Sequence, residues 1–373
     1  MDVLTLRGLN RATLHRQRLL ARCDEPVPDV LEHLVGLQAQ VPDVPYLALW
    51  SRLRDFDPEP LAELMRTRQA VRMPLMRATI HLVTAQDGLA LRPVLHPVLA
   101  RTFAGTTWGQ ALASEDMDAI LAAGQALVEE RPRTRATLGA LLRERWPHAD
   151  PAGLALALTY LVAVVQVTPR GVWSERGQAT WTTVTAWLGG EPGSEPGYAS
   201  GAASREDVLL RYLAAFGPAT VKDAQMWCGL TRLREVADGL GERLRRFRTE
   251  EGADLLDVPD GPLPDPDTPA PPRFLPEYDN ALLSYADRTR VVRPGDHVLL
   301  RGGSGGHVGT VLVDGFLSAT WALRRTGSRA VLEVRPSRAL GARERAAVSE
   351  EGARLLAFLA SDADHDIRVH APP

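Results

Sequence analysis

Two glutamines that flank one small residue are the side chains of this chain whose type and spacing could do chemistry. Gln38 and Gln40 stand on either side of Ala39 in the segment Gly36–Tyr46. Two prolines follow within that segment, and because proline lacks an N–H and restricts the residue before it, the segment is a poor helix interior. We expect both amides where a helix gives way to a turn, at a fixed and water-accessible place. Their oxygens can orient a water molecule or stabilise positive charge; the alternative is a polar turn without chemistry.

A second candidate set lies on a predicted strand further along the chain. Arg77, Thr79 and His81 alternate with apolar residues, so they are expected to share one face of that strand. This face is either a solvated polar surface or one that touches phosphate.

A third candidate pair follows a proline-rich loop. Asp279 and Asn280 end the run Pro276–Asn280, which places an acid, an aromatic residue and an amide together. Taken alone, this run predicts a turn closed by an Asx-type hydrogen bond.

The glycine-rich run Gly302–Gly306 is predicted to be a hairpin tip and not a nucleotide loop. No Lys-Ser/Thr pair follows it, and β-patterned segments on both sides leave no helix N-terminus to face a phosphate. A mobile tip of this kind could insert into a nucleic-acid groove. The residues that would do so are Arg301, Gly303, Ser304, Gly305 and His307.

No pattern in the chain predicts a metal or a cofactor. Asp362, Asp364 and Asp366 have the spacing of a calcium loop, but Ile367 occupies the position that requires glycine, so an exposed acidic tail is expected. The nine histidines form no recognised ligand spacing. No nucleophile elbow or histidine-paired cysteine motif is present. The only lysine, Lys222, falls at a predicted helix start, a poor place for a Schiff-base nucleophile.

The bulk composition is that of an ordinary globular protein of several domains. The chain has 373 residues, of which 45% are apolar and 24% are charged, so two to four domains are expected. No apolar run reaches the roughly 20 residues of a membrane helix, and the first residues do not form a secretory signal. The two cysteines are isolated. We therefore expect a cytoplasmic protein without a membrane partner, and a monomer.

Net charge does not decide whether the partner is a nucleic acid. The formal charge is −3, and nearly all positive charge is arginine. A GC-rich genome explains that bias equally well, although the arginine fork is also the better phosphate ligand. An acidic protein can still present one basic concave face.

Three stretches of the chain repeat one order of elements. Each has a first helix, two shorter helical segments and a β-patterned hairpin, which is the layout of a winged helix, a helix-turn-helix variant. In the first stretch the strands are expected at 70–73 and 78–83, and a helix broken near its two prolines follows at 84–103. After a proline-rich crossing segment, strands are expected at 297–301, 308–313, 317–323 and 330–334, with a helix at 337–359.

The predicted fold class is therefore α+β, mainly α, with tandem winged-helix domains and a C-terminal β-rich subdomain. The domains expected are 1–108 with the glutamine motif, 109–195, 196–260, and 261–373 with the crossing segment, the β-rich part and its closing helix.

Six separated segments, in the same order along nearly the whole chain, resemble the AlkZ/YcaQ-type winged-helix DNA glycosylases. They are Gly36–Tyr46, Arg77–Val83, Ala215–Thr220, Leu275–Asn280, Ala286–Arg290 and Gly309–Gly315. The resemblance implies a C-shaped scaffold with a concave DNA-binding face. It also implies a catalytic glutamine–apolar–glutamine motif, matched by Gln38-Ala39-Gln40. A sister group carries aspartate at the second position, so Gln40 places this chain on the AlkZ-like side, which is associated with producers of DNA-alkylating natural products.

The function that the resemblance implies is hydrolysis of the N-glycosidic bond of bulky N7-alkylated purines in duplex DNA. Gln38 and Gln40 would be catalytic, and the strand, loop and hairpin residues named above would bind DNA. The enzyme would be monofunctional, without a lyase step, and would serve repair or self-resistance, with crosslink unhooking as an extension. The alternatives are a winged-helix regulator that does no chemistry and a protein that sequesters damage without cleaving it.

Overall fold

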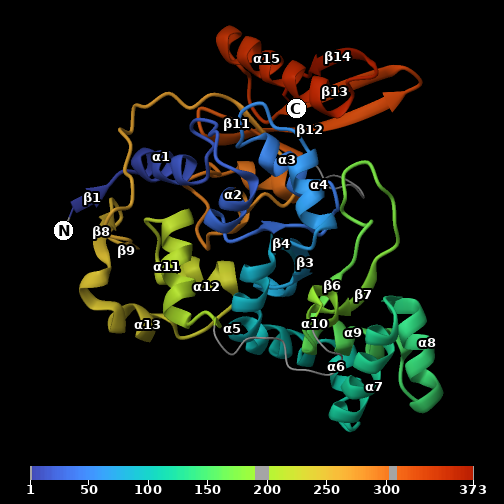
Figure 1. The fold of residues 1–373 in the computed structure, drawn as a ribbon. Coiled ribbons are helices and arrows are strands. Elements are labelled where there is room, and N and C mark those ends of the chain that lie inside the picture. Colours follow the sequence, from blue (N-terminus) through green and yellow to red (C-terminus); the bar gives the residue numbers. More distant parts are fainter. Residues whose placement is uncertain (1, 190–200, 302–308, 373) are drawn as a thin grey trace.

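The computed structural model describes residues 2–189, 201–301 and 309–372, and within these ranges the strands form three sheets. Figure 1 shows the chain from its N-terminal helices to the C-terminal sheet, which lies at one end of the molecule with α15 beside it. The architecture is a mixture of helices and strands. Among the described helices, none is long and apolar enough to span a membrane.

The N-terminal part contains the glutamine segment and begins with a capped helix. Thr5 caps α1 by accepting a hydrogen bond from the Gly8 N–H. The elements are α1 (Leu6–Arg16), α2 (Val27–His33), β2 (Leu37–Gln38), α3 (Val44–Trp50), α4 (Glu59–Arg66), β3 (Ala70–Pro74), the 3₁₀ helix η1 (Met76–Ala78), β4 (Ile80–Thr84) and α5 (Ala85–Ala104).

The second part continues the sheet of the first. Its elements are α6 (Thr107–Ala111), α7 (Met117–Glu130), β5 (Arg133–Thr134), α8 (Arg135–Arg145), α9 (Pro151–Leu161), β6 (Val164–Gln166), β7 (Thr180–Thr183) and α10 (Val184–Leu188). Strand β6 pairs with β3 through the register Arg72↔Gln166. The result is one six-stranded sheet in the order β2-β4-β3-β6-β7-β5.

The third part is a helical unit with a small sheet of its own. It contains α11 (Arg205–Phe216), α12 (Val221–Cys228), α13 (Leu233–Leu240), the 3₁₀ helix η3 (Gly241–Arg243), β8 (Arg245–Thr249) and β9 (Asp254–Asp257). Capping boxes start α11 and α12, each by a Ser or Thr that exchanges hydrogen bonds with an aspartate three residues later. The N-terminal strand β1 (Asp2–Leu4) adds to β8 in parallel.

The C-terminal part is a five-stranded sheet covered by one long helix. Its elements are β10 (Arg273–Leu275), α14 (Asn280–Leu283), the 3₁₀ helix η4 (Asp296–Arg301), β11 (Gly309–Val313), β12 (Phe316–Thr326), β13 (Arg329–Pro336), α15 (Ala342–Leu359) and β14 (Asp364–Val369). The order is β10-β11-β12-β13-β14, and only the β13–β14 pair is parallel. Its apolar face packs together with Trp50 of α3.

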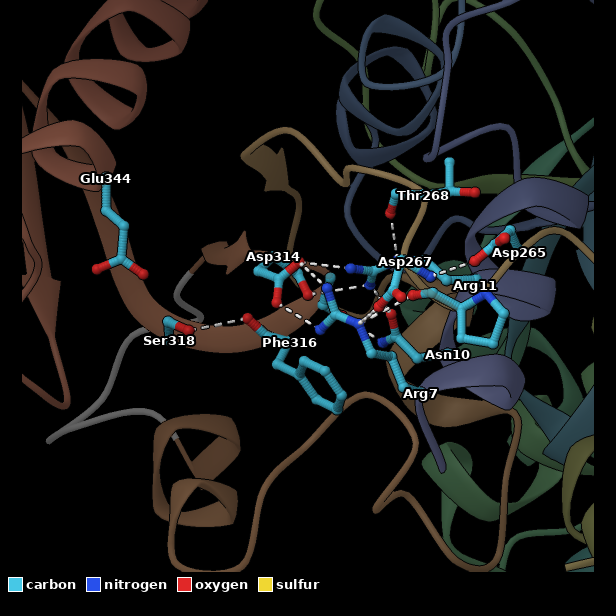
Figure 2. A network of polar contacts seen from close by, with 12 residues as sticks. Arg7, Asn10, Arg11, Asp265, Asp267, Thr268, Asp314, Phe316, Ser318 and Glu344 are labelled. Atoms are coloured by element: carbon cyan, nitrogen blue, oxygen red, sulfur yellow. Dashed lines mark hydrogen bonds and ion pairs between the residues drawn. The ribbon is translucent and has the colours of Figure 1, made fainter. Parts of the chain in front are cut away.

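A polar network fixes this sheet to the first helix. The turn between β11 and β12 has positive φ at Asp314 and Gly315, as an Asp-Gly hairpin turn requires. Arg7 and Arg11 both pair with the Asp314 carboxylate, and the Asn10 amide donates to the Gly315 carbonyl at 2.7 Å (Figure 2). This turn therefore holds α1 against the C-terminal sheet.

The structure confirms most of the expected elements and corrects several. The helix before the glutamines ends at His33, and α5 continues through Pro93 and Pro97 without the expected break. The segment 297–301 is 3₁₀ helix and not strand. The acidic tail is strand β14, in which Asp366 pairs with Arg329.

Candidate functional site

The glutamine motif is built into the edge of the large sheet. Strand β2 pairs with β4 in antiparallel register, with Leu37 opposite Leu82 and Gln38 opposite His81. The pairing continues where the Ala39 N–H donates to the Ile80 carbonyl at 2.7 Å. Gln38 therefore lies in a short strand, while the expectation placed it where a helix gives way to a turn.

A strained turn at residues 35–36 immediately precedes strand β2. Val35 and Gly36 both have positive φ, which is rare for a β-branched residue. A Cβ on Gly36 would lie 2.4 Å from Val83 Cγ1, so only glycine fits there. Asn280 Nδ2 donates to the Gly36 carbonyl at 2.9 Å and holds the turn. Such strain persists only where the surroundings determine it, and it concentrates at functional sites.

One buried arginine holds the backbone of the motif, and a second holds the loop that leads to Asn280. Arg72 Nη2 donates to the Ala39 carbonyl at 2.6 Å, between the two glutamines. Burial, followed by the charge of Arg170, lowers the pKa of Arg72 to about 10. Arg52 forms a two-pronged ion pair with Asp279, with both N–O distances 2.8 Å and neither side chain exposed. Sequence reasoning did not find Arg52 or Arg72, because their partners lie far along the chain.

The orientation of the Gln38 amide follows from its partner. Arg77 Nη2 lies 2.9 Å from Gln38 Oε1, and since a guanidinium only donates, the amide oxygen must face it. One lone pair of Oε1 remains for another donor. Gln38 Nε2 has no hydrogen-bond partner within the described part of the chain. Gln38 is 6% exposed, so nearly all of its surface is buried.

Gln40 is the exposed member of the pair. The Ile80 N–H lies 3.4 Å from Gln40 Oε1, a long contact that holds the amide weakly. Gln40 can therefore reorient toward a ligand, while Gln38 cannot without breaking its contact with Arg77.

Arg77 links the motif to the third part of the molecule. It sits in η1 with φ of +54°, and its Nη1 donates to the Trp227 carbonyl at 2.9 Å. Burial lowers the pKa of Arg77 to about 10; the nearby Cys228 opposes this shift and the charge of Arg288 adds to it. Arg77, Thr79 and His81 do not share one strand face as predicted, because the chain folds into the 3₁₀ turn before β4 begins at Ile80.

His81 is part of the interior, which corrects the prediction that it contacts DNA. Its side chain is 0% exposed, and its Nδ1 lies 3.0 Å from the Thr79 carbonyl. Burial, with the charge of Arg77 next, lowers the pKa of His81 to about 3. The imidazole is therefore neutral at physiological pH, and it packs behind Gln38.

Asp279 and Asn280 also require correction as DNA ligands, because both are 3% exposed and present no free surface to a duplex. Their role in the structure is to hold the loops around the glutamines, through Arg52 and Gly36. Thr79 is half-buried and donates its hydroxyl to the Met76 carbonyl. Gly303, Ser304, Gly305 and His307 lie outside the described residues, and of Arg301 only the backbone at the end of η4 is described.

Comparison with known proteins decides the family. A family model described as DNA glycosylase AlkZ-like matches residues 31–358, which is most of the chain. This chain belongs to the AlkZ-like DNA glycosylase family. The glutamine motif lies inside the matched region.

The fold agrees with a solved member of the same family. The DNA glycosylase AlkZ of Streptomyces sahachiroi superimposes with a TM-score of 0.77, covering 99% of this chain and 100% of that one, at 20% sequence identity. At this identity the likeness shows a shared fold. A search of curated protein sequences gave no significant match.

Proposed function

We propose that this member of the AlkZ-like family is a DNA glycosylase that hydrolyses the N-glycosidic bond of bulky N7-alkylated purines in duplex DNA. The observation that carries the proposal is the fixed position of Gln38 beside the exposed Gln40, in a segment held by donors from the N-terminal and C-terminal parts of the molecule. The biological role would be repair, or self-resistance to a DNA-alkylating natural product, with crosslink unhooking as an extension.

Two amides suit this reaction because the leaving group needs no strong acid. A purine alkylated at N7 is already cationic, so the bond breaks through an oxocarbenium-like sugar as in other glycoside hydrolyses. Gln38 Oε1, with its remaining lone pair, stabilises the sugar cation as a fixed dipole, and Gln40 turns its amide to orient the water. Neither amide accepts the proton fully, which restricts the enzyme to good leaving groups.

No amine nucleophile lies beside the motif among the residues that the structure describes. Lys222 lies in the first turn of α12, whereas Arg77 joins the glutamine motif to Trp227 at the other end of that helix. We therefore propose a monofunctional enzyme in which water is the nucleophile and no lyase step follows.

The proposed DNA scaffold is a set of tandem winged-helix domains. It would comprise residues 1–108, 109–195 and 196–260, with 261–373 as the C-terminal subdomain, arranged as a C-shaped surface around the duplex. The helix-and-hairpin order of α11–α13 with β8 and β9 supports this assignment for the third unit. We propose that the protein acts as a monomer on DNA in the bacterial cytoplasm.

The test is base release from a duplex that carries one N7-alkylguanine, followed by alkali to cleave abasic sites. The Gln38→Ala, Gln40→Ala double variant should lose at least about 10²–10³ in rate, because removal of one transition-state dipole alone costs that much. DNA affinity should stay within a few fold. Gln110→Ala, at an exposed position on α6, is the matched control and should keep full activity.

The same experiment separates the alternatives. Without alkali the strand should stay intact, and strand cleavage would contradict the absence of a lyase step. Full activity of the double variant would refute the role of the glutamines. Tight binding by the native protein without base release, on a range of alkylated duplexes, would support a regulator or a sequestering protein.

A further inference from the structure

Positive charge gathers at the C-terminal end of helix α12, beside Gln38. Arg77 Nη1 donates to the Trp227 carbonyl at 2.9 Å, and Arg101 Nη2 donates to the Gly229 carbonyl at 2.6 Å. Arg205 Nη2 donates to the Thr231 carbonyl. These guanidinium groups come from η1, α5 and α11. Three separate segments therefore each place one cation at the C-terminal end of α12.

Arg288 lies near the same helix, because the backbone N–H groups of Ala286 and Asp287 just before it donate to Asp223 in the first turn of α12. The charge of Arg288 is among those that act on the pKa of Arg77. The charges of Arg205 and Arg77 both oppose the rise that burial causes in the pKa of Cys228, the last residue of α12. Three of these arginines therefore contact the stretch 227–231, and Arg288 lies near the same helix.

None of the four has a carboxylate partner in the part of the chain that the structure describes. Most other arginines of this acidic protein are paired, for example Arg16 with Asp257 and Arg211 with Asp87. The carbonyls at the end of α12 offset part of the charge, because the C-terminus of a helix carries partial negative charge. The guanidinium of Arg288 receives no such compensation, since it makes no hydrogen bond or ion pair within the described residues; only the backbone carbonyl of Arg288 accepts hydrogen bonds.

The position of this charge matters for chemistry that creates a cation. Arg77 touches the amide of Gln38, and an uncompensated guanidinium there would oppose an oxocarbenium-like sugar. An anion at the cluster removes that conflict. The DNA backbone supplies one, because phosphate accepts two parallel hydrogen bonds from a guanidinium fork.

We propose that Arg77, Arg101, Arg205 and Arg288, here called the α12 cluster, bind the DNA phosphates next to the damaged nucleotide. This inference rests on the proposed function, because it takes DNA as the ligand. Arg77 belongs to both the cluster and the motif, so backbone binding and orientation of the Gln38 amide are joined in one side chain.

The experiment measures the salt dependence of binding to a duplex without a lesion, so that no turnover occurs. Each phosphate contact adds about 0.9 to the negative slope of log K against log salt concentration. Arg288→Ala and Arg101→Ala should each reduce that slope by about 0.9, and the double variant by about 1.8. Ethylation of the phosphates beside an alkylated nucleotide should inhibit binding of the native protein more strongly than binding of the double variant, which keeps only Arg77 and Arg205 of the cluster.

Two variants keep the test specific to charge. Arg288→Lys should retain the native slope, and Arg288→Ala should keep the native unfolding temperature. Arg329→Ala, an exposed arginine already paired with Asp366 on the C-terminal sheet, is the control and should leave the slope unchanged.

A native slope in the Arg101→Ala, Arg288→Ala double variant would overturn the proposal, as would an Arg288→Lys variant that behaves like Arg288→Ala. These outcomes are independent of catalysis. If the native protein released no base from any alkylated duplex while the slopes changed as expected, the glycosylase function would fail and the phosphate site would stand.

Discussion

The loops around the glutamine motif and the edge of the C-terminal sheet use arginine in opposite ways. Arg52 pairs with Asp279 where both side chains are 0% exposed, while Arg325 pairs with Asp362 where they are 45% and 76% exposed. The first pair joins the end of α3 to the cap of α14, since Asp279 also accepts from the Ala281 N–H. The second joins strand β12 to the turn before β14.

The difference shows where charge positions a site and where it only solvates a surface. A buried ion cannot be solvated by water when its partner is removed, so loss of the partner lowers stability strongly. An exposed ion exchanges its partner for water at little cost. The interior arginines around Gln38 are therefore the part of this arginine-rich sequence that determines the geometry of the site.

Arg52→Ala should give the largest loss of stability. It leaves the Asp279 carboxylate buried without a counter-ion, and breaking such a pair costs about 3–5 kcal/mol. Denaturant unfolding measures this. The Arg52→Met, Asp279→Asn double variant removes both charges and keeps a side-chain acceptor for the Ala281 N–H, so it should lose less than the single variant. A smaller loss in Arg52→Ala than in the double variant would contradict the comparison.

Acid should destabilise the buried region next, through His81. Its folded pKa of about 3 lies below the unfolded value, so the unfolded chain binds the extra proton and stability falls as the pH drops from about 6.5 toward 3. By pH 4 this amounts to about 3 kcal/mol. His81→Asn cannot titrate there and keeps a donor for the Thr79 carbonyl. Between pH 7 and 4 the free energy of unfolding, measured with denaturant at each pH, should therefore fall less for this variant than for the native protein. An equal fall in both proteins would show that His81 is not the cause.

Arg325→Ala should have the smallest effect. Its partner Asp362 is solvated, and although the hydrogen bond from Arg325 lowers the pKa of that carboxyl, water replaces the contact. The thermal unfolding midpoint should match the native value within error. A shift as large as that of Arg52→Ala would remove the distinction between the two regions.

Local signals in the sequence were enough for much of the fold. The strands expected at 70–73 and 78–83 correspond to β3 and β4, and the helix expected at 84–103 corresponds to α5. Strand β14 was not predicted because it lies at the edge of its sheet and carries charged residues. Charged side chains protect an edge strand from further pairing, and in the sequence they resemble those of a solvent-exposed segment. The prolines of α5 suggested a break that tertiary packing overrides.

The site was predictable in its central residues and not in its surroundings. The spacing of Gln38 and Gln40 singled out the motif. No local sequence signal predicts that α2 ends at His33 or that Val35 adopts a positive φ. The contact of Arg77 with both Gln38 and Trp227 joins residues 39 and 150 positions apart. The polar character of His81, Asp279 and Asn280 suggested a surface, whereas all three are buried, Asp279 and Asn280 against the distant Arg52 and Gly36.

The parallel pairing of β1 with β8 has a consequence for how this protein is made. Asp2–Leu4 is synthesised well before its partner, which begins at Arg245, about 240 residues later. At the usual rates of synthesis the first strand waits roughly 12 to 50 seconds for its neighbour. The small sheet of the third unit is thus completed by a segment from the far end of the chain, so its closure is a late and non-local event in folding.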